Sequence, residues 1–138
     1  MKRYLLDTGL LGGYLLCRKT AVDIVKPWIS RGEVATSILV YAEVVEYIKS
    51  LRDFPRRHDE LKRLLKEVHP YILTYSILER YSDIRRVLRP RGGLIGDIDT
   101  LIAATALDRN LTIVTSDTDY ERVPDLKVMR IDLKVKSP

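Results

Sequence analysis

Short apolar runs alternate with longer amphipathic segments along the whole chain. Each short run is long enough for a buried strand, and each longer segment carries one apolar stripe at helical spacing. This alternation is typical of βαβ units, so we expect an α/β fold with a central, mainly parallel sheet. The predicted strands are residues 3–6, 34–36, 71–73, 111–115 and 127–131.

The intervening segments predict helices of ordinary length. Pro27 lies inside the first of them and could kink or split it, whereas Pro70 cannot continue the helix that precedes it. The last segment carries several small residues, which suit a buried helix packed closely on the sheet. The predicted helices are residues 20–31, 38–51, 57–68, 76–88 and 100–107.

Length and composition favour one globular domain over residues 1–138. The chain has 46% apolar and 31% charged residues, and it contains no internal repeat or low-complexity linker. No apolar run approaches the roughly 20 residues of a membrane span, and the first residues do not resemble a secretion signal. We therefore expect a protein of the cytoplasm with no membrane partner.

The single cysteine, Cys17, excludes an intrachain disulfide and a cysteine metal cluster. We expect it to be a buried structural thiol. The two histidines, His58 and His69, lie outside the acidic motifs and are expected at the surface, which makes a zinc site a poor interpretation.

Basic residues are unevenly distributed around a net charge of +5. Half of them fall in residues 49–66 and 80–91. Such stretches can be solvated helix faces, or they can form a basic surface for a polyanion. The candidate acidic site described next favours the second interpretation, a surface that binds nucleic acid.

Four acids occupy positions at which they could converge. Asp7 and Asp117 follow apolar runs, so both belong at the carboxyl ends of strands, where open α/β sheets build their sites. Asp99 begins the small-residue helix, where the helix dipole favours its charge. Glu43 lies inside an apolar stretch and needs a partner if it faces inward. Taken singly, each aspartate could equally be a helix or turn cap.

Carboxylates gathered in one pocket repel one another unless their pKa values rise or a divalent cation neutralises them. Oxygen-only ligands favour Mg²⁺ or Mn²⁺. Asp97 precedes Asp99 by two positions, so it could contact a second metal, cap the helix or face solvent.

Four segments together resemble the motifs of PIN-domain ribonucleases, and most of all the VapC-type toxins of VapBC toxin–antitoxin pairs. The segments are Tyr4-Leu5-Leu6-Asp7-Thr8, Ser37 to Val44, Gly96 to Ala106 and Leu111 to Tyr120. Their order and spacing carry the resemblance over residues 3–131. It implies a three-layer α/β/α fold and a metal-dependent endoribonuclease that is neutralised by a VapB-like antitoxin.

Carried over position by position, the resemblance assigns the catalytic, metal-holding quartet to Asp7, Glu43, Asp99 and Asp117, with Asp97 as an uncertain further ligand. Neighbouring hydroxyls would orient the carboxylates. Asp119 is a peripheral acid, and Tyr120 stands where the family often has phenylalanine, which indicates packing. The matched hydroxyl positions are Thr8, Ser37 and Thr115.

The resemblance also bears on partners. The substrate would be RNA, hydrolysed to 5′-phosphate and 3′-hydroxyl products. Residues 10–16, together with helices in 38–68, could form a groove for an antitoxin helix, although core burial is the simpler role for their leucines. A homodimer is also expected.

Two other classes stay open. A receiver-like phosphoacceptor would need a lysine near the acids, but Lys127 stands at the wrong end of its strand. A catalytically weak PIN-like module that binds RNA or protein is the stronger alternative. A DNA nuclease would need additional DNA-gripping elements.

Overall fold

The computed structural model describes residues 1–133, so the last five positions of the predicted domain lie outside the described residues. Within residues 1–133 the chain alternates between strands and helices. In chain order the elements are β1 (Tyr4–Leu6), α1 (Thr8–Leu15), α2 (Lys19–Ser30), β2 (Val34–Ser37), α3 (Ile38–Ile48), α4 (Phe54–Leu64), β3 (His69–Tyr71), α5 (Tyr75–Leu88), η1 (Arg89–Arg91), α6 (Asp97–Asp108), β4 (Thr112–Thr115), η2 (Thr118–Arg122) and β5 (Val128–Arg130).

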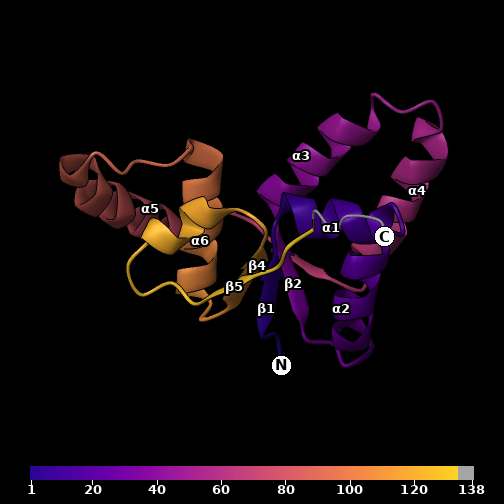
Figure 1. Ribbon diagram of the computed structural model, residues 1–138, viewed down its shortest axis with the longest axis horizontal. Helices are drawn as coiled ribbons and strands as arrows, with labels where there is room; N and C mark the ends of the chain where they lie inside the picture. Colours follow the sequence, from indigo (N-terminus) through magenta and orange to yellow (C-terminus); the bar gives the residue numbers. More distant parts are fainter. Residues whose placement is uncertain (134–138) are drawn as a thin grey trace.

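The five strands of this part of the chain form one parallel sheet in the order β3-β2-β1-β4-β5. Helices α1 to α4 lie on one side of the sheet and α5 and α6 on the other, which makes three layers (Figure 1). The predicted α/β/α fold with a parallel sheet is confirmed. The chain builds outward from β1 to β3 and then crosses to β4, so the strand order switches between β1 and β4. Open α/β sheets bind ligands at the carboxyl ends of strands at such a switch point.

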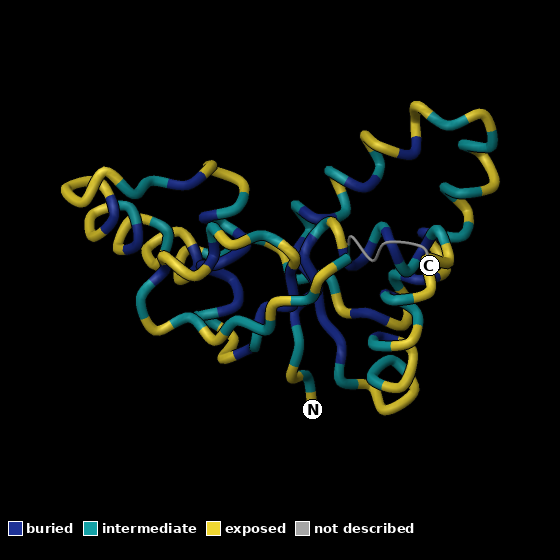
Figure 2. Tube along the Cα trace, viewed as in Figure 1, coloured by how far each residue is buried: buried dark blue, intermediate teal, exposed yellow. Residues whose placement is uncertain are grey.

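The two strands at this switch point are buried on both faces. Leu5 and Leu6 of β1 and Ile113 and Val114 of β4 have no exposed surface, and Figure 2 shows the buried centre running along these strands. A parallel strand that is covered on both faces is apolar along its whole length, which explains why β1 and β4 could be predicted from the sequence. The alanines of α6 are buried as well and allow this helix to approach the sheet closely, as expected.

The segment around β3 differs from the prediction. The helix expected at 57–68 is α4, which begins three residues earlier because Pro55 in its first turn carries the φ angle that a helix start requires. The strand expected at 71–73 is β3, which begins at His69 and includes Pro70. β3 lies at the edge of the sheet, where a missing N–H is tolerated. Pro27 does not split α2, which continues to Ser30.

Cys17 corrects a second expectation, because its side chain is exposed rather than buried. It lies in the turn between α1 and α2 with a φ of 57°. The turn is held by the Cys17 and Arg18 N–H groups, which donate to the carbonyls of Tyr14 and Gly13. This reversal directs the thiol outward. His69 is exposed as expected, whereas His58 is half-buried and stacks on Phe54.

Candidate active site

Asp7 is the most buried of the predicted site residues, with 7% of its surface exposed. It follows β1 and caps α1, since its Oδ1 accepts from the Leu10 N–H at 3.1 Å. Its Oδ2 accepts from the Thr115 hydroxyl at the end of β4. One carboxylate therefore joins the two strands of the switch point.

The pKa of Asp7 is raised from 3.8 to about 6. Burial is the main cause, because removal from water disfavours the charged form. The hydrogen bonds from Thr115 and Leu10 lower the pKa, and the negative charges of Asp99 and Asp117 raise it. Because the charges of Asp99 and Asp117 act on Asp7, the three acids lie in one region of the fold, although they are far apart in the sequence.

Asp99 lies in the first turn of α6, where the helix dipole favours a carboxylate. Burial is the main cause of its raised pKa. A hydrogen bond from Tyr120 lowers the pKa, and the negative charges of Glu43, Asp117 and Asp119 raise it further. The Tyr120 hydroxyl donates to Asp99 Oδ1 at 3.1 Å. The charges of three other acids thus act on Asp99.

Tyr120 has a role that the sequence analysis missed. Its side chain is 1% exposed, which agrees with the packing interpretation, but its hydroxyl also orients Asp99. Burial raises the pKa of this phenol, which keeps the proton on the donor. The only signal available in the sequence was a hydroxyl at a position expected to hold a plain aromatic ring.

Glu43 faces inward and has the partner that its position required. The Thr8 hydroxyl donates to Glu43 Oε1 at 2.5 Å, which links α3 to the first residue of α1. Thr8 and Thr115 thus contact carboxylates as predicted. Among residues 1–133, Ser37 makes no hydrogen bond to an acid; its hydroxyl accepts from the Leu39 N–H and caps α3.

Asp117 follows β4, and its backbone N–H donates to the Thr115 hydroxyl oxygen at 3.0 Å. Thr115 therefore receives a bond from Asp117 and donates one to Asp7. The Asp117 carboxylate caps η2 by accepting from the Asp119 N–H at 2.8 Å. Asp119 itself forms an ion pair with Arg122 at 3.1 Å and lies at the periphery.

Asp97 stands apart from this group. Its side chain is 71% exposed, and its Oδ1 accepts from Arg85 at 2.8 Å and from Tyr81 at 3.1 Å, both on α5. The structure thus brings Asp7, Glu43, Asp99 and Asp117 together and directs Asp97 toward α5. A metal-binding role for Asp97 stays a prediction.

The quartet fits a divalent cation in charge and in donor chemistry. It offers carboxylate oxygens, which Mg²⁺ and Mn²⁺ prefer, and the charges of neighbouring acids raise the pKa values of Asp7 and Asp99. Within residues 1–133, however, no three Asp, Glu, His or Cys side chains are placed so that they could hold one metal ion. The quartet therefore matches a divalent cation in its charge and in the type of its ligand atoms.

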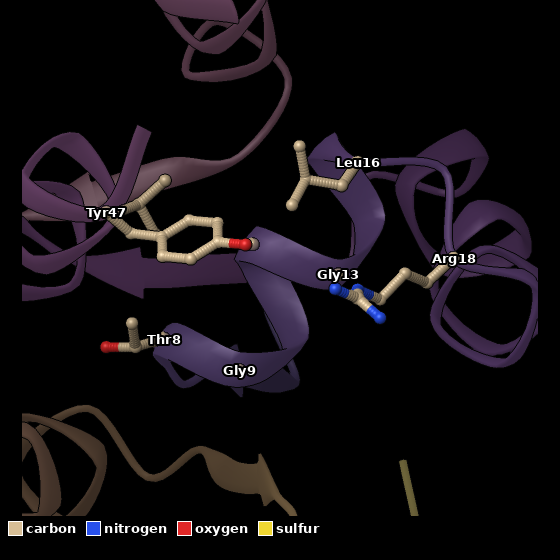
Figure 3. A pocket seen from close by; sticks show the side chains of 8 residues that line it. Thr8, Gly9, Gly13, Leu16, Arg18 and Tyr47 are labelled. Atoms are coloured by element: carbon tan, nitrogen blue, oxygen red, sulfur yellow. The ribbon is translucent and has the colours of Figure 1, made fainter. Parts of the chain in front are cut away.

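A groove begins beside the quartet at Thr8. It has a volume of about 310 Å³ and runs between α1 and α3. Figure 3 shows Tyr47, Leu16 and Arg18 arranged around it, with the glycines of α1 forming its floor. Leu10, Leu11 and Leu15 are buried in the core instead. The apolar surface predicted between these helices is therefore present, and Leu16 is the leucine of this segment that lines it.

Substitution of Tyr120 by phenylalanine tests the hydroxyl without emptying the core. Since the hydrogen bond lowers the pKa of Asp99, its loss is expected to raise that pKa and move the acidic limb of any pH–activity profile to higher pH. The Mg²⁺ concentration for half-maximal activity should rise by about tenfold, the lower end of the effect seen for partners of metal ligands. Thermal unfolding serves as the control for folding. An unchanged profile and metal requirement would mean that Tyr120 only packs.

Solved toxin–antitoxin structures share this fold. A VapBC2 structure from Rickettsia felis, bound to a promoter DNA fragment, superposes with a TM-score of 0.82 at 22% identity and covers 94% of this chain and 98% of that chain. The FitAcB structure from Neisseria gonorrhoeae gives a TM-score of 0.74 at 25% identity, covering 92% and 96% of the two chains.

Sequence comparison adds distant homology to VapC ribonucleases. Ribonuclease VapC6 of Mycobacterium tuberculosis is 29% identical over 93 residues, which cover 62% of this chain and 72% of the relative. Ribonuclease VapC1 of Haemophilus influenzae is 23% identical over 126 residues, which cover 90% of this chain and 94% of the relative. The model of the PIN domain matches residues 4–126, and the chain therefore belongs to the PIN domain family.

Proposed function

We propose that this protein is a metal-dependent endoribonuclease and the toxin of a type II toxin–antitoxin pair. The observation that carries the proposal is the convergence of Asp7, Glu43, Asp99 and Asp117 at the switch point of the sheet, where the charges of Asp99 and Asp117 raise the pKa of buried Asp7. The distant VapC ribonuclease relatives support the same reaction. An RNA substrate would place the activity in the cytoplasm.

In this proposal Asp7, Asp99 and Asp117 hold Mg²⁺ or Mn²⁺, and Glu43 completes the set or accepts a proton from the attacking water. The bound cation would supply the positive charge that activates water and stabilises the transition state at phosphorus. Thr8, Thr115 and Tyr120 hold the carboxylates in place through their hydroxyls. Attack by water in line with the leaving 3′ oxygen would yield 5′-phosphate and 3′-hydroxyl ends.

The groove between α1 and α3 suits the apolar face of an antitoxin helix. It opens beside Thr8, so an occupant would lie next to the acids and restrict access to them. The exposed Tyr47, at 48%, and Arg18 offer an aromatic and a charged contact at its edges. The VapBC structures of similar fold belong to a family of toxin–antitoxin systems, which supports a VapB-like partner. A homodimer belongs to the same proposal.

A catalytically weak module that binds RNA or protein is the second candidate. One observation favours it: among residues 1–133, no three Asp, Glu, His or Cys side chains are placed so that they could hold a metal ion. In that case the acids would hold the cleft together through Thr8, Thr115 and Tyr120 without turning over substrate.

Removal of the metal separates these two functions. We expect purified protein, free of antitoxin, to cut total RNA at discrete positions with Mg²⁺ or Mn²⁺ and to stop when EDTA is added, because the carboxylates alone cannot neutralise charge at the phosphate. Readdition of the metal should restore cleavage, and end analysis should find 5′-phosphates. RNA that stays intact with either metal, while still bound by the protein, would establish the binding module. Cleavage that survives EDTA would refute the metal mechanism.

A further inference from the structure

The outer face of α5 carries a second hollow, separate from the groove at Thr8. Its volume is about 500 Å³, and it lies where α5 meets η1. Helix α5 packs along α6 on the side of the sheet away from α1 to α4 (Figure 1). The described residues that line the hollow include no acid: they are Tyr81, Ser82, Arg85, Arg86, Arg89 and Pro90.

The three arginines of this hollow are not equivalent. Arg85 is half-buried and its charge is compensated by Asp97 at 2.8 Å. Arg86 and Arg89 are exposed, and neither has a carboxylate partner among residues 1–133. Two uncompensated guanidinium groups on one helix face repel each other, and an anion placed between them relieves that repulsion.

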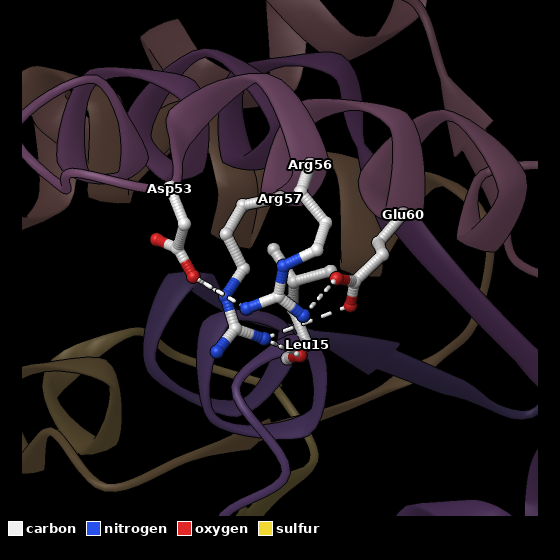
Figure 4. Close-up of polar contacts among 5 residues, drawn as sticks. All are labelled: Leu15, Asp53, Arg56, Arg57 and Glu60. Carbon is white, nitrogen blue, oxygen red and sulfur yellow. Dashed lines mark hydrogen bonds and ion pairs between the residues drawn. The ribbon is translucent and has the colours of Figure 1, made fainter.

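Two of the four arginines of the other basic stretch, Arg56 and Arg57, are paired with carboxylates among residues 1–133. On α4, Arg56 contacts Asp53 at 2.6 Å and Glu60 at 3.1 Å, and Arg57 contacts Asp53 at 3.1 Å (Figure 4). Arg57 also donates to the Leu15 carbonyl and so ties α4 to α1. The charges of Arg56 and Arg57 are therefore compensated by carboxylates of the same protein. Those of Arg86 and Arg89 are not compensated within residues 1–133.

We propose that the hollow formed by Arg86 and Arg89 binds a phosphate of a single-stranded RNA backbone. The RNA identity rests on the proposed function. Guanidinium groups bind phosphate oxygens in a fork, whereas the Ser82 hydroxyl at the edge of the hollow donates to the Leu78 carbonyl at 3.2 Å. Arg85 joins the hollow to the acids, since its partner Asp97 begins α6 two residues before Asp99. One RNA strand would thus contact the hollow and the acidic site through the same end of α6.

A second copy of the chain fits this face less well. A two-fold interface places the same patch on both sides, so Arg86 and Arg89 would meet their own counterparts. Such like-charge contacts oppose association. RNA offers the opposite charge at regular spacing along its backbone.

The test measures RNA affinity against salt in an Asp99→Asn background, in which the RNA is not cut. A short fluorescein-labelled single-stranded RNA is titrated with the parent, with Arg86→Ala/Arg89→Ala, and with Lys62→Ala/Lys66→Ala. The control removes the same charge from exposed positions of α4 and its C-terminal end, across the sheet. Loss of the one phosphate held by the two arginines should lower the slope of log K against log salt by about 0.7, the value for one phosphate of a single strand. The lysine control should keep the parent slope.

Equal slopes for the arginine variant and the parent would overturn the proposal, as would an equal loss in the lysine variant, which would indicate general attraction. A change in sedimentation of the arginine variant with an unchanged slope would assign the face to self-association and would also overturn it. Binding is measured without cleavage, so a protein that binds through the hollow but never cuts RNA would refute the proposed function and leave this subsite standing.

Discussion

Asp99→Asn is expected to reduce RNA cleavage by at least about a hundredfold while the protein stays folded. Asparagine keeps the size of the side chain and an oxygen that can accept from the Tyr120 hydroxyl. It removes the negative charge that a divalent cation requires. Loss of a direct ligand should exceed the 10–100-fold effect of changing its partners. The measurement is the single-turnover rate on a defined RNA across a range of Mg²⁺ concentrations.

Two matched aspartates make this result specific. Asp59→Asn removes the same charge from an exposed position of α4 and should leave the rate unchanged. Asp97→Asn lies two residues from Asp99 but breaks an ion pair with Arg85, so we expect a loss of less than about tenfold. An equal collapse in the Asp97 and Asp99 variants would add Asp97 to the metal ligands. Full activity in Asp99→Asn would remove Asp99 from the site.

The free energy of unfolding of the metal-free protein should fall as the pH rises from about 4 to about 6, and Asp7 is the main cause. Its folded pKa, about 6, is above the ordinary value of 3.8, so the folded state holds a proton that the unfolded chain has released. Below this window both states are protonated and the carboxyl costs nothing. Above it both are ionised, and the buried charge costs about 3 kcal/mol.

Asp7→Asn isolates this contribution. The neutral amide keeps an oxygen to cap α1 at Leu10, and it has no charge to desolvate. Denaturant unfolding of both proteins at several pH values should give curves that agree near pH 4 and separate toward pH 7, with the variant more stable by up to about 3 kcal/mol. Asp99, whose pKa is also raised, is present in both proteins, so only its charge interaction with Asp7 differs between them. Parallel curves would show that Asp7 has an ordinary pKa.

Mg²⁺ supplies the control for this pH experiment. If Asp7 holds the cation in the folded protein, Mg²⁺ should stabilise the parent near pH 7 by binding only the folded state, and it should stabilise Asp7→Asn much less. The apparent instability of the site would then be the cost of keeping carboxylates ready for a metal. Equal stabilisation of both proteins would place the cation elsewhere.

Local pattern was enough for the parallel sheet and its connecting helices, whereas the three layers were expected from the resemblance to PIN-domain ribonucleases. A parallel strand buried on both faces must be apolar throughout, so β1 and β4 were visible as runs, and the acids that follow them were expected at one edge of the sheet. The structure differed from the prediction near two prolines, where the preference of proline competes with the apolar pattern. Pro55 moved the start of α4, and the edge position of β3 allowed Pro70 to lie inside a strand.

Only the tertiary structure decided which polar groups meet. Asp97 and Asp99 look alike in the sequence, yet the rotation between them along α6 directs one to Arg85 on α5 and the other to Tyr120. Arginines within one basic stretch also look alike, yet Arg85 on α5 is paired with Asp97, whereas Arg86 and Arg89 have no carboxylate partner in residues 1–133. Apolar periodicity is a property of neighbouring residues, so the sequence by itself determined the strands, the parallel sheet and the sheet edge at which the acids lie. Charge compensation depends on distances between elements far apart in the chain, and these exist only after packing.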